Sequence, residues 1–250
     1  MYSPAQTDTT SINLDDSPIP VFTRWLGSWR LSIHRRALSA PELAQSYDRV
    51  AASWDRTLDR FAYPDAYERL LRHVLAERLT ACSGRPLRAL DAGAGTGQLA
   101  LALARASSTP VTIEAVDISE QMLQRADNRM SRAGLDFAVR QADARQLPYD
   151  DNTFDVAMTA HLLEHMPNPR LAIAEMVRVT RPGGLVIACL TRRSALGFYI
   201  HLKWRTHMVT LALAKAWFAE VGLRNPGCLS TQRKDFFQRM SIACAGTKSL

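Results

Sequence analysis

The sequence has few cysteines, and their spacing gives them no shared role. The four cysteines, at positions 82, 189, 228 and 244, include no C-x-x-C pair. Neither a zinc site nor a disulfide framework is indicated, so we expect four reduced thiols and no bound metal.

Long apolar segments are also missing. The first 20 residues are polar, carry Asp8, Asp15 and Asp16, and contain no apolar stretch of the kind found in secretory signals. These acids also argue against a mitochondrial presequence. Lys215 interrupts the longest apolar candidate near the C-terminus, so no membrane-spanning helix is predicted. We expect a cytoplasmic protein, peripheral on the inner membrane face if its basic parts bind lipid.

Acidic residues are scarce in the last 70 residues. Residues 181–250 hold 11 Lys and Arg against 2 acids, Glu220 and Asp235, a net charge of +9, whereas residues 1–180 carry −2. A basic C-terminal portion favours an anionic partner, whether a phosphate-bearing substrate, a lipid surface or a nucleic acid.

The length and composition of the chain are sufficient for one α/β domain with additional segments. The 250 residues are 47% hydrophobic and can bury a full core. Residues 1–20, rich in Ser, Thr, Asp and Pro, predict a disordered tail. Residues 21–84 are interpreted as an N-terminal helical cap, and residues 85–250 as the core, with a basic and aromatic insert at 191–207.

The stretch 21–36 carries tryptophans at helical spacing. Its apolar residues fit one helical face and its basic residues fall mainly on the other: Phe22, Trp25, Leu26, Trp29 and Ile33 against Arg24, Arg30, His34 and Arg35. Such a helix either lies in the interface of a membrane or covers the surface of its own domain.

The stretch from Leu87 to Gly97 predicts a short buried strand followed by a glycine-rich turn. Strong helix formers follow directly at 98–105. This order lets a ligand approach backbone N–H groups at the N-terminus of a helix. A dinucleotide fingerprint would place its third glycine at position 98, but here the turn has the form D-x-G-x-G-x-G, with Asp91, Gly93, Gly95 and Gly97.

A second predicted strand, 111–117, ends in an acid. Asp117 lies 20 residues after Gly97, where a carboxylate reaches both hydroxyls of a bound ribose. Ile118 is placed to pack on an adenine ring, and Ser119 to cap the helix that follows.

Further strands are predicted at 136–140, 154–159 and 185–190, with a helix at 168–179 before the turn Arg181-Pro182-Gly183-Gly184. In an open α/β sheet, ligands bind at the carboxyl ends of the strands. Ala160, His161 and His165 follow the fourth strand and are therefore expected at the site.

These motifs resemble, in order and spacing, the class I S-adenosylmethionine-dependent methyltransferases of the ubiquinone/menaquinone-biosynthesis-like type (methyltransferase type 11). The wording V-D-I-S-x-x-M-L from Val116 matches closely, and the resemblance covers roughly residues 45–190. It implies a Rossmann-like, seven-stranded mixed sheet sandwiched by helices, with a helical cap. It also implies the cofactor S-adenosyl-L-methionine, which leaves as S-adenosyl-L-homocysteine.

The resemblance also implies which residues bind the cofactor. Tyr47, in a segment similar to the family's entry motif, would lie over the methionine end, or else be a buried aromatic of the cap. Asp143 and Ala144 would meet the adenine. The full expected set is Tyr47, Asp91, Gly93, Ala94, Gly95, Gly97, Asp117, Ile118, Met122, Asp143, Ala144, Ala160 and His161.

Methyl transfer from a sulfonium requires mainly alignment of the acceptor and exclusion of water. A general base is needed only for an acceptor that is protonated at the working pH. His165 is the catalytic residue we predict, and His161 is expected to line the cofactor site through its backbone. Either histidine is open to a structural role instead.

The motifs leave the acceptor open. We predict a small apolar or amphiphilic acceptor, with an anionic membrane surface as a partner through 21–36 and 191–207; the insert is equally open to being a solvated loop. The alternative substrate is a phospholipid head group, methylated on nitrogen. The alternative of another class is a non-catalytic cofactor- or partner-binding protein. A nucleic-acid substrate is not expected, because no N-P-P-Y-type motif follows the fourth strand.

Overall fold

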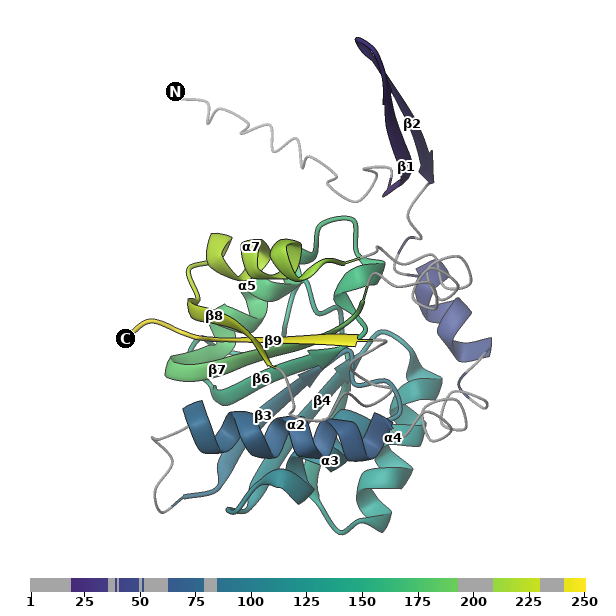
Figure 1. Ribbon diagram of the computed structural model, residues 1–250. Helices are drawn as coiled ribbons and strands as arrows, with labels where there is room; N and C mark the ends of the chain where they lie inside the picture. Colours follow the sequence, from purple (N-terminus) through teal and green to yellow (C-terminus); the bar gives the residue numbers. More distant parts are fainter. Residues whose placement is uncertain are drawn as a thin grey trace, which may run out of the picture.

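One mixed sheet of seven strands organises the protein (Figure 1). The computed structural model describes residues 19–35, 39, 41–49, 51, 63–78, 85–192, 209–229 and 241–250. Within these ranges the strand order is β5-β4-β3-β6-β7-β9-β8. The strands from β5 to β7 are parallel, and β9 runs antiparallel to both of its neighbours. The predicted Rossmann-like mixed sheet is confirmed.

The strands and helices alternate along the core. They are α2 (Tyr63–Arg78), β3 (Leu87–Ala92), α3 (Gln98–Ala106), β4 (Val111–Asp117), α4 (Glu120–Arg132), β5 (Asp136–Gln141), β6 (Phe154–Ala160), the 3-10 helix η2 (Leu163–His165), α5 (Pro169–Val179), β7 (Thr180–Thr191), α7 (Leu211–Glu220), β8 (Arg224–Leu229) and β9 (Ser241–Thr247). None of the described helices is both long enough and apolar enough to cross a membrane.

Helices cover both faces of the sheet, so its central strands are buried on both sides. In β7, Ile187 and Cys189 belong to the core beneath α2 and α3, whereas Val186 and Ala188 belong to the core beneath α5 and α7. This alternation explains why the central strands are nearly continuous apolar runs in the sequence.

One predicted turn lies inside a strand. The turn at 181–184 is part of β7, because Thr180 already pairs with Phe154 before the register shifts. Helix α2 begins at Tyr63, with Pro64 in its first turn, where the missing N–H costs nothing.

The helix predicted over 21–36 is wrong. Residues 19–35 form an antiparallel hairpin of β1 (Ile19–Leu26) and β2 (Trp29–Arg35), drawn apart from the sheet in Figure 1. Gly27, with φ of 60°, begins the two-residue turn that pairs Leu26 with Trp29. From Trp29 onward the sequence alternates apolar and polar residues strictly, and this period of two outweighs the helical spacing.

A short helix begins after Ser39. Residues 41–49 are helical, and the backbone N–H and hydroxyl of Ser39 both donate to Glu42 Oε2 over 2.9 Å. Serine followed three residues later by glutamate is a capping box. Residues 1–18 of the predicted tail and 193–207 of the predicted insert lie outside the described ranges.

The order of the strands in the sheet determines where a ligand site is expected. From β3 the chain moves outward through β4 to β5, then returns to β6 on the other side of β3. Ligands bind at such a switch point, beyond the carboxyl ends of the strands.

Candidate functional site

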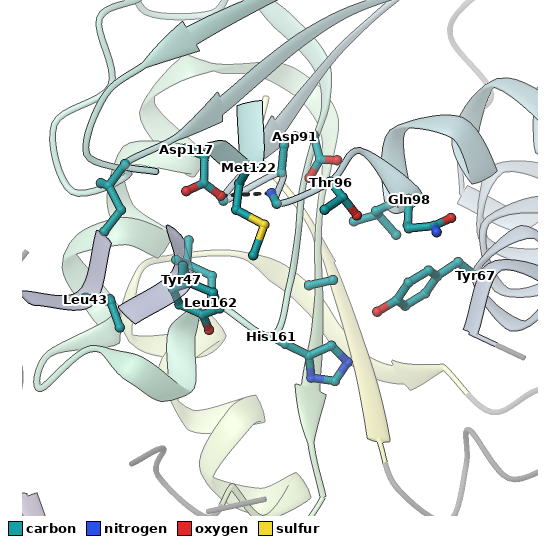
Figure 2. A pocket seen from close by; sticks show the side chains of 16 residues that line it. Leu43, Tyr47, Tyr67, Asp91, Thr96, Gln98, Asp117, Met122, His161 and Leu162 are labelled. Carbon is teal, nitrogen blue, oxygen red and sulfur yellow. Dashed lines mark hydrogen bonds between the residues drawn. The ribbon is translucent and has the colours of Figure 1, made fainter. Parts of the chain in front are cut away.

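A cavity lies beyond the carboxyl ends of β3, β4 and β6, at the switch point (Figure 2). Its main lobe is lined by Leu43, Tyr47, Tyr67, Asp91, Gly93, Ala94, Gly95, Thr96, Gln98, Leu99, Asp117, Ile118, Met122, Ala160, His161 and Leu162. An adjoining lobe shares Leu43, Gly93, Asp117, Ile118 and Leu162, and adds Ala142, Asp143, Ala144, Arg145, His165, Met166 and Pro167. The shared residues make the two lobes one elongated site.

The glycine turn forms one wall of the cavity. Gly93 has φ of 72°, and a Cβ atom there would lie 2.8 Å from the Leu162 side chain. Gly95 has φ of 54° and borders open space, so its backbone is accessible to a ligand. Gly97 does not line the cavity: it packs against Ala126 of α4, which a Cβ atom would meet at 3.2 Å.

Asp91 supplies a buried carboxylate that has no partner. Its side chain is 1% exposed, and neither oxygen has a hydrogen-bond donor in good geometry among the described residues. Burial raises the pKa of this carboxyl to about 7, the Ala100 amide opposes the shift, and the charge of Asp117 adds to it. Such a group favours a cationic or hydroxyl-rich ligand.

Asp117 ends β4 and braces the glycine turn. It accepts hydrogen bonds from the Gly95 N–H at 2.8 Å, dashed in Figure 2, and from the Ser119 N–H at 2.9 Å. Burial raises its pKa, and these amides oppose the shift. Because a carboxylate has about four acceptor positions, two remain for a ligand.

Asp143 lies in the adjoining lobe and is already engaged. Arg145 donates to it from its backbone at 2.8 Å and from its guanidinium at 2.6 and 3.0 Å. Burial alone would raise the pKa of Asp143, but these contacts lower it. The pairing with Arg145 was not predicted, since nothing in the local pattern distinguishes this arginine.

Tyr47 and His165 form a pair at the edge of the cavity. The Tyr47 hydroxyl lies 2.6 Å from His165 Nε2, and the rings meet edge to face. Beside them Asp48 accepts from the Ser119 hydroxyl at 2.5 Å. The helix at 41–49 is thereby tied to both ends of the site. His165 therefore has a hydrogen-bonding role within the protein, which the sequence did not reveal.

Sequence reasoning found the acids, the turn and the strand ends, but missed several apolar lining residues. Leu43, Tyr67, Leu99, Leu162, Met166 and Pro167 line the cavity without standing in any recognisable pattern. They come from four different parts of the chain, and only folding brings them together.

The part of the chain that forms this site is similar to known proteins. Residues 90–188 match a family described as "Methyltransferase domain". Over these residues the chain is similar to methyltransferases. The matched segment runs from β3 to β7 and includes the glycine turn, Asp117 and Asp143.

Several curated proteins are similar to parts of this chain. The ubiquinone/menaquinone biosynthesis C-methyltransferase of Bdellovibrio bacteriovorus is 32% identical over 150 residues, 59% of this chain and 61% of that protein. The demethylmenaquinone methyltransferase of Geobacillus kaustophilus is 28% identical over 192 residues, 72% of this chain and 80% of that protein. Matches thus span about three fifths of the length of the first relatives.

Solved structures share the fold at low identity. The [4+2]-cyclase SpnF superposes with a TM-score of 0.64 at 21% identity, covering 86% of this chain and 98% of that one. Geranyl diphosphate methyltransferase in complex with S-adenosylmethionine gives a TM-score of 0.57 at 14% identity, covering 72% and 85%.

Proposed function

We propose that this protein is an S-adenosylmethionine-dependent methyltransferase whose cofactor lies in the two-lobed cavity. The observation that carries the proposal is the pair of acids, the buried Asp91 and the half-buried Asp117, at the ends of adjacent parallel strands around the glycine turn. The unpartnered Asp91 carboxylate suits the ammonium group of the cofactor's amino-acid end. The free acceptor positions of Asp117 suit ribose hydroxyls.

The remaining cavity residues suit the rest of the molecule. Ile118 and Met122 offer an apolar surface between the two acids, and Asp143 and Ala144 line the lobe proposed for the adenine. The bound cofactor would supply an activated methyl group. The tasks of this chain are therefore to bind and orient the acceptor and to exclude water from the site. Tyr47, held by His165, covers the site from the helix at 41–49.

Calorimetry with S-adenosylhomocysteine tests cofactor binding. We expect Asp117→Ala to weaken the affinity well over tenfold with an unchanged circular dichroism spectrum, because ribose hydroxyls lose their acceptor. Asp127→Ala, on the exposed face of α4, is the matched control. Unchanged affinity in the Asp117 variant would contradict the cofactor assignment, and Asp117→Asn checks that the glycine turn is not simply disrupted.

For the acceptor we propose a small apolar or amphiphilic molecule of the quinol class. The support is that one similar protein is named a ubiquinone/menaquinone biosynthesis C-methyltransferase and another a demethylmenaquinone methyltransferase. The test incubates the protein with methyl-labelled cofactor and 2-methyl-1,4-naphthoquinol, a tail-less probe of this class. Label in the extracted quinol supports it. Cofactor binding without any transfer would favour a different chemistry, since a cyclase shares this fold.

A phospholipid acceptor at a membrane surface is the second candidate, and the hairpin favours it. Trp25, Leu26, Trp29 and Leu31 are 64%, 53%, 77% and 52% exposed. The register sets Leu26 opposite Trp29, and Arg24 opposite Leu31. Exposed tryptophans beside arginines are typical of surfaces that enter anionic bilayers.

Vesicle co-sedimentation separates these candidates. The full chain and a version lacking residues 1–38 are mixed with neutral and with anionic vesicles and labelled cofactor. Binding to anionic vesicles that is lost on truncation, with label in the phospholipid, supports a lipid acceptor. Absence of binding in both forms removes the membrane proposal and leaves the soluble acceptor.

A further inference from the structure

A strained histidine stands where β6 enters the cavity. His161 has φ of 56°, and its backbone N–H donates to the Cys189 carbonyl at 2.8 Å. The other described non-glycine residues with positive φ are Asn152 and Asn225, of a residue type that adopts this region readily. Positive φ is uncommon for any residue other than glycine, although histidine is among the types enriched there, and backbone conformations of this kind concentrate at functional sites.

The imidazole of His161 is held by a buried carboxylate. His161 Nδ1 lies 3.1 Å from Glu164 Oε1 and 3.1 Å from Thr191 Oγ1. Glu164 is fully buried and also accepts from the Thr191 N–H at 2.9 Å and hydroxyl at 2.7 Å. Burial would raise the pKa of Glu164, but these hydrogen bonds and the nearby imidazoles lower it to about 2.

This arrangement fixes which ring nitrogen carries the proton. An ionised carboxylate only accepts, so Nδ1 is the N–H donor in the neutral ring, and Nε2 keeps its lone pair. His161 Nε2 is a buried atom and has no hydrogen-bond partner among the described residues, whereas His165 Nε2 is engaged by Tyr47.

The position of His161 also suits contact with an acceptor. Figure 2 shows the ring at the lower side of the cavity, away from Asp117. It packs edge to face on Tyr63, whose hydroxyl meets Ser241 at the start of β9. The ring therefore lies over the ends of β6, β7 and β9, while the acids proposed for the cofactor stand at β3 and β4.

We propose that His161 is the general base of the reaction and that Glu164 and Thr191 position it. The inference rests on the proposed methyltransferase function. As the acceptor's O–H or C–H proton moves to His161 Nε2, the electron pair freed on the acceptor forms the bond to the cofactor methyl. The carbon–sulfur bond breaks and its electrons stay on sulfur. The positive charge passes from the sulfonium to the imidazolium beside Glu164, and the proton later leaves to water.

The first test requires no acceptor. Diethyl pyrocarbonate acylates only an unprotonated imidazole nitrogen, and peptide mass spectrometry locates the label. Because Nε2 is buried, we expect slower labelling at His161 than at an exposed histidine, and labelling at least fivefold slower again in Glu164→Gln, since a glutamine amide can donate to Nδ1 and shift the N–H to Nε2. The exposed His73 of α2 is the internal control, with equal labelling in both forms. No label at His161, or equal rates there, would overturn the proposal.

The second test measures transfer to 2-methyl-1,4-naphthoquinol. His161→Asn suits the positive φ, and we expect kcat to fall at least 100-fold while the calorimetric affinity for S-adenosylhomocysteine stays within about twofold. Transfer at the wild-type rate by this variant would overturn the base assignment and leave the proposed function intact. Failure of the wild-type protein to bind S-adenosylhomocysteine would instead count against the proposed function, and the labelling experiment would still decide the state of His161.

Discussion

At the scale of single residues, the site depends on two acids that the fold withdraws from water, Asp91 fully and Asp117 in part. Asp91 and Asp117 both line one cavity, and burial raises the pKa of each. They differ in their partners: Asp117 braces the glycine turn through two backbone amides, whereas Asp91 has no hydrogen bond of good geometry among the described residues. An acid that is costly to bury and stabilises no neighbour is best explained by a ligand.

Asp91→Asn should stabilise the ligand-free protein at pH 8. The folded pKa of about 7 lies above the unfolded value of about 4, so wild-type stability falls as the pH rises from 4 through 7. Three pKa units correspond to at most about 4 kcal/mol, and asparagine avoids this cost. Calorimetric melting at pH 5 and pH 8 measures the effect. If the variant's gain in melting temperature over the wild type were no larger at pH 8 than at pH 5, this prediction would be contradicted.

The same substitution should weaken the binding of S-adenosylhomocysteine more than tenfold at pH 8, because the ligand's ammonium loses its counter-charge. A variant that is both more stable and poorer at binding is expected where a site is built at the expense of stability.

At the scale of elements, Asp155 joins the starts of three neighbouring strands. It begins β6 and accepts from the Arg85 guanidinium at 2.8 and 2.5 Å, the Arg88 N–H at 2.9 Å and Arg181 at 2.9 Å. Burial would raise its pKa, but these donors lower it to about 2. The clamp lies at the end of the sheet opposite the cavity.

Asp155→Asn should lower the free energy of unfolding by about 2 kcal/mol at pH 7. Because the folded pKa lies below the unfolded one, this stabilisation is present above pH 4 and is lost as the pH falls towards 2. Urea unfolding at pH 7 and pH 3 checks the sign. If the loss of unfolding free energy in Asp155→Asn were as large at pH 3 as at pH 7, the negative charge of Asp155 would not be the source of the stabilisation.

Packing between α3 and α4 depends on Gly97. With φ of 77° and an added Cβ at 3.2 Å from Ala126, Gly97→Ala should cost about 3 kcal/mol. Gly134→Ala, with φ of 66° and open space around it, isolates the backbone strain and should cost about 1 kcal/mol. Chemical denaturation measures the loss of unfolding free energy in each variant. Equal losses in the two variants would show that the contact with Ala126 contributes nothing.

At the scale of the whole molecule, the hairpin and the sheet are separate structures. The described side chains from Arg24 to Leu31 are exposed, and β1 and β2 pair only with each other. The helix at 41–49, in contrast, is tied to the site through Tyr47 and Asp48.

Deleting residues 1–35 should leave the melting temperature within about 2 °C, since a free two-stranded hairpin adds little stability. Deletion through residue 49 should weaken S-adenosylhomocysteine binding at least tenfold, because it removes Tyr47 and Asp48. Calorimetry on both truncations measures the two effects. A large stability loss from the shorter deletion would mean that the hairpin is part of the core.

The sequence by itself determined the sheet and the acids at its edge. Buried parallel strands appear as unbroken apolar runs, and the glycine turn and Asp117 belong to short local patterns, so these features were predictable from single segments. The hairpin was missed because its apolar residues also fit a helical spacing; the strict alternation from Trp29 and the turn at Gly27 favour the two strands that the structure shows.

Only the tertiary structure decided which side chains act together. The pairing of Tyr47 with His165 joins residues 118 positions apart, and the unpartnered state of Asp91 depends on everything packed around it. His165 and His161 look alike in the sequence. Their hydrogen-bond partners, Tyr47 for one and Glu164 for the other, give them different chemistry, because long-range packing is not encoded in local spacing.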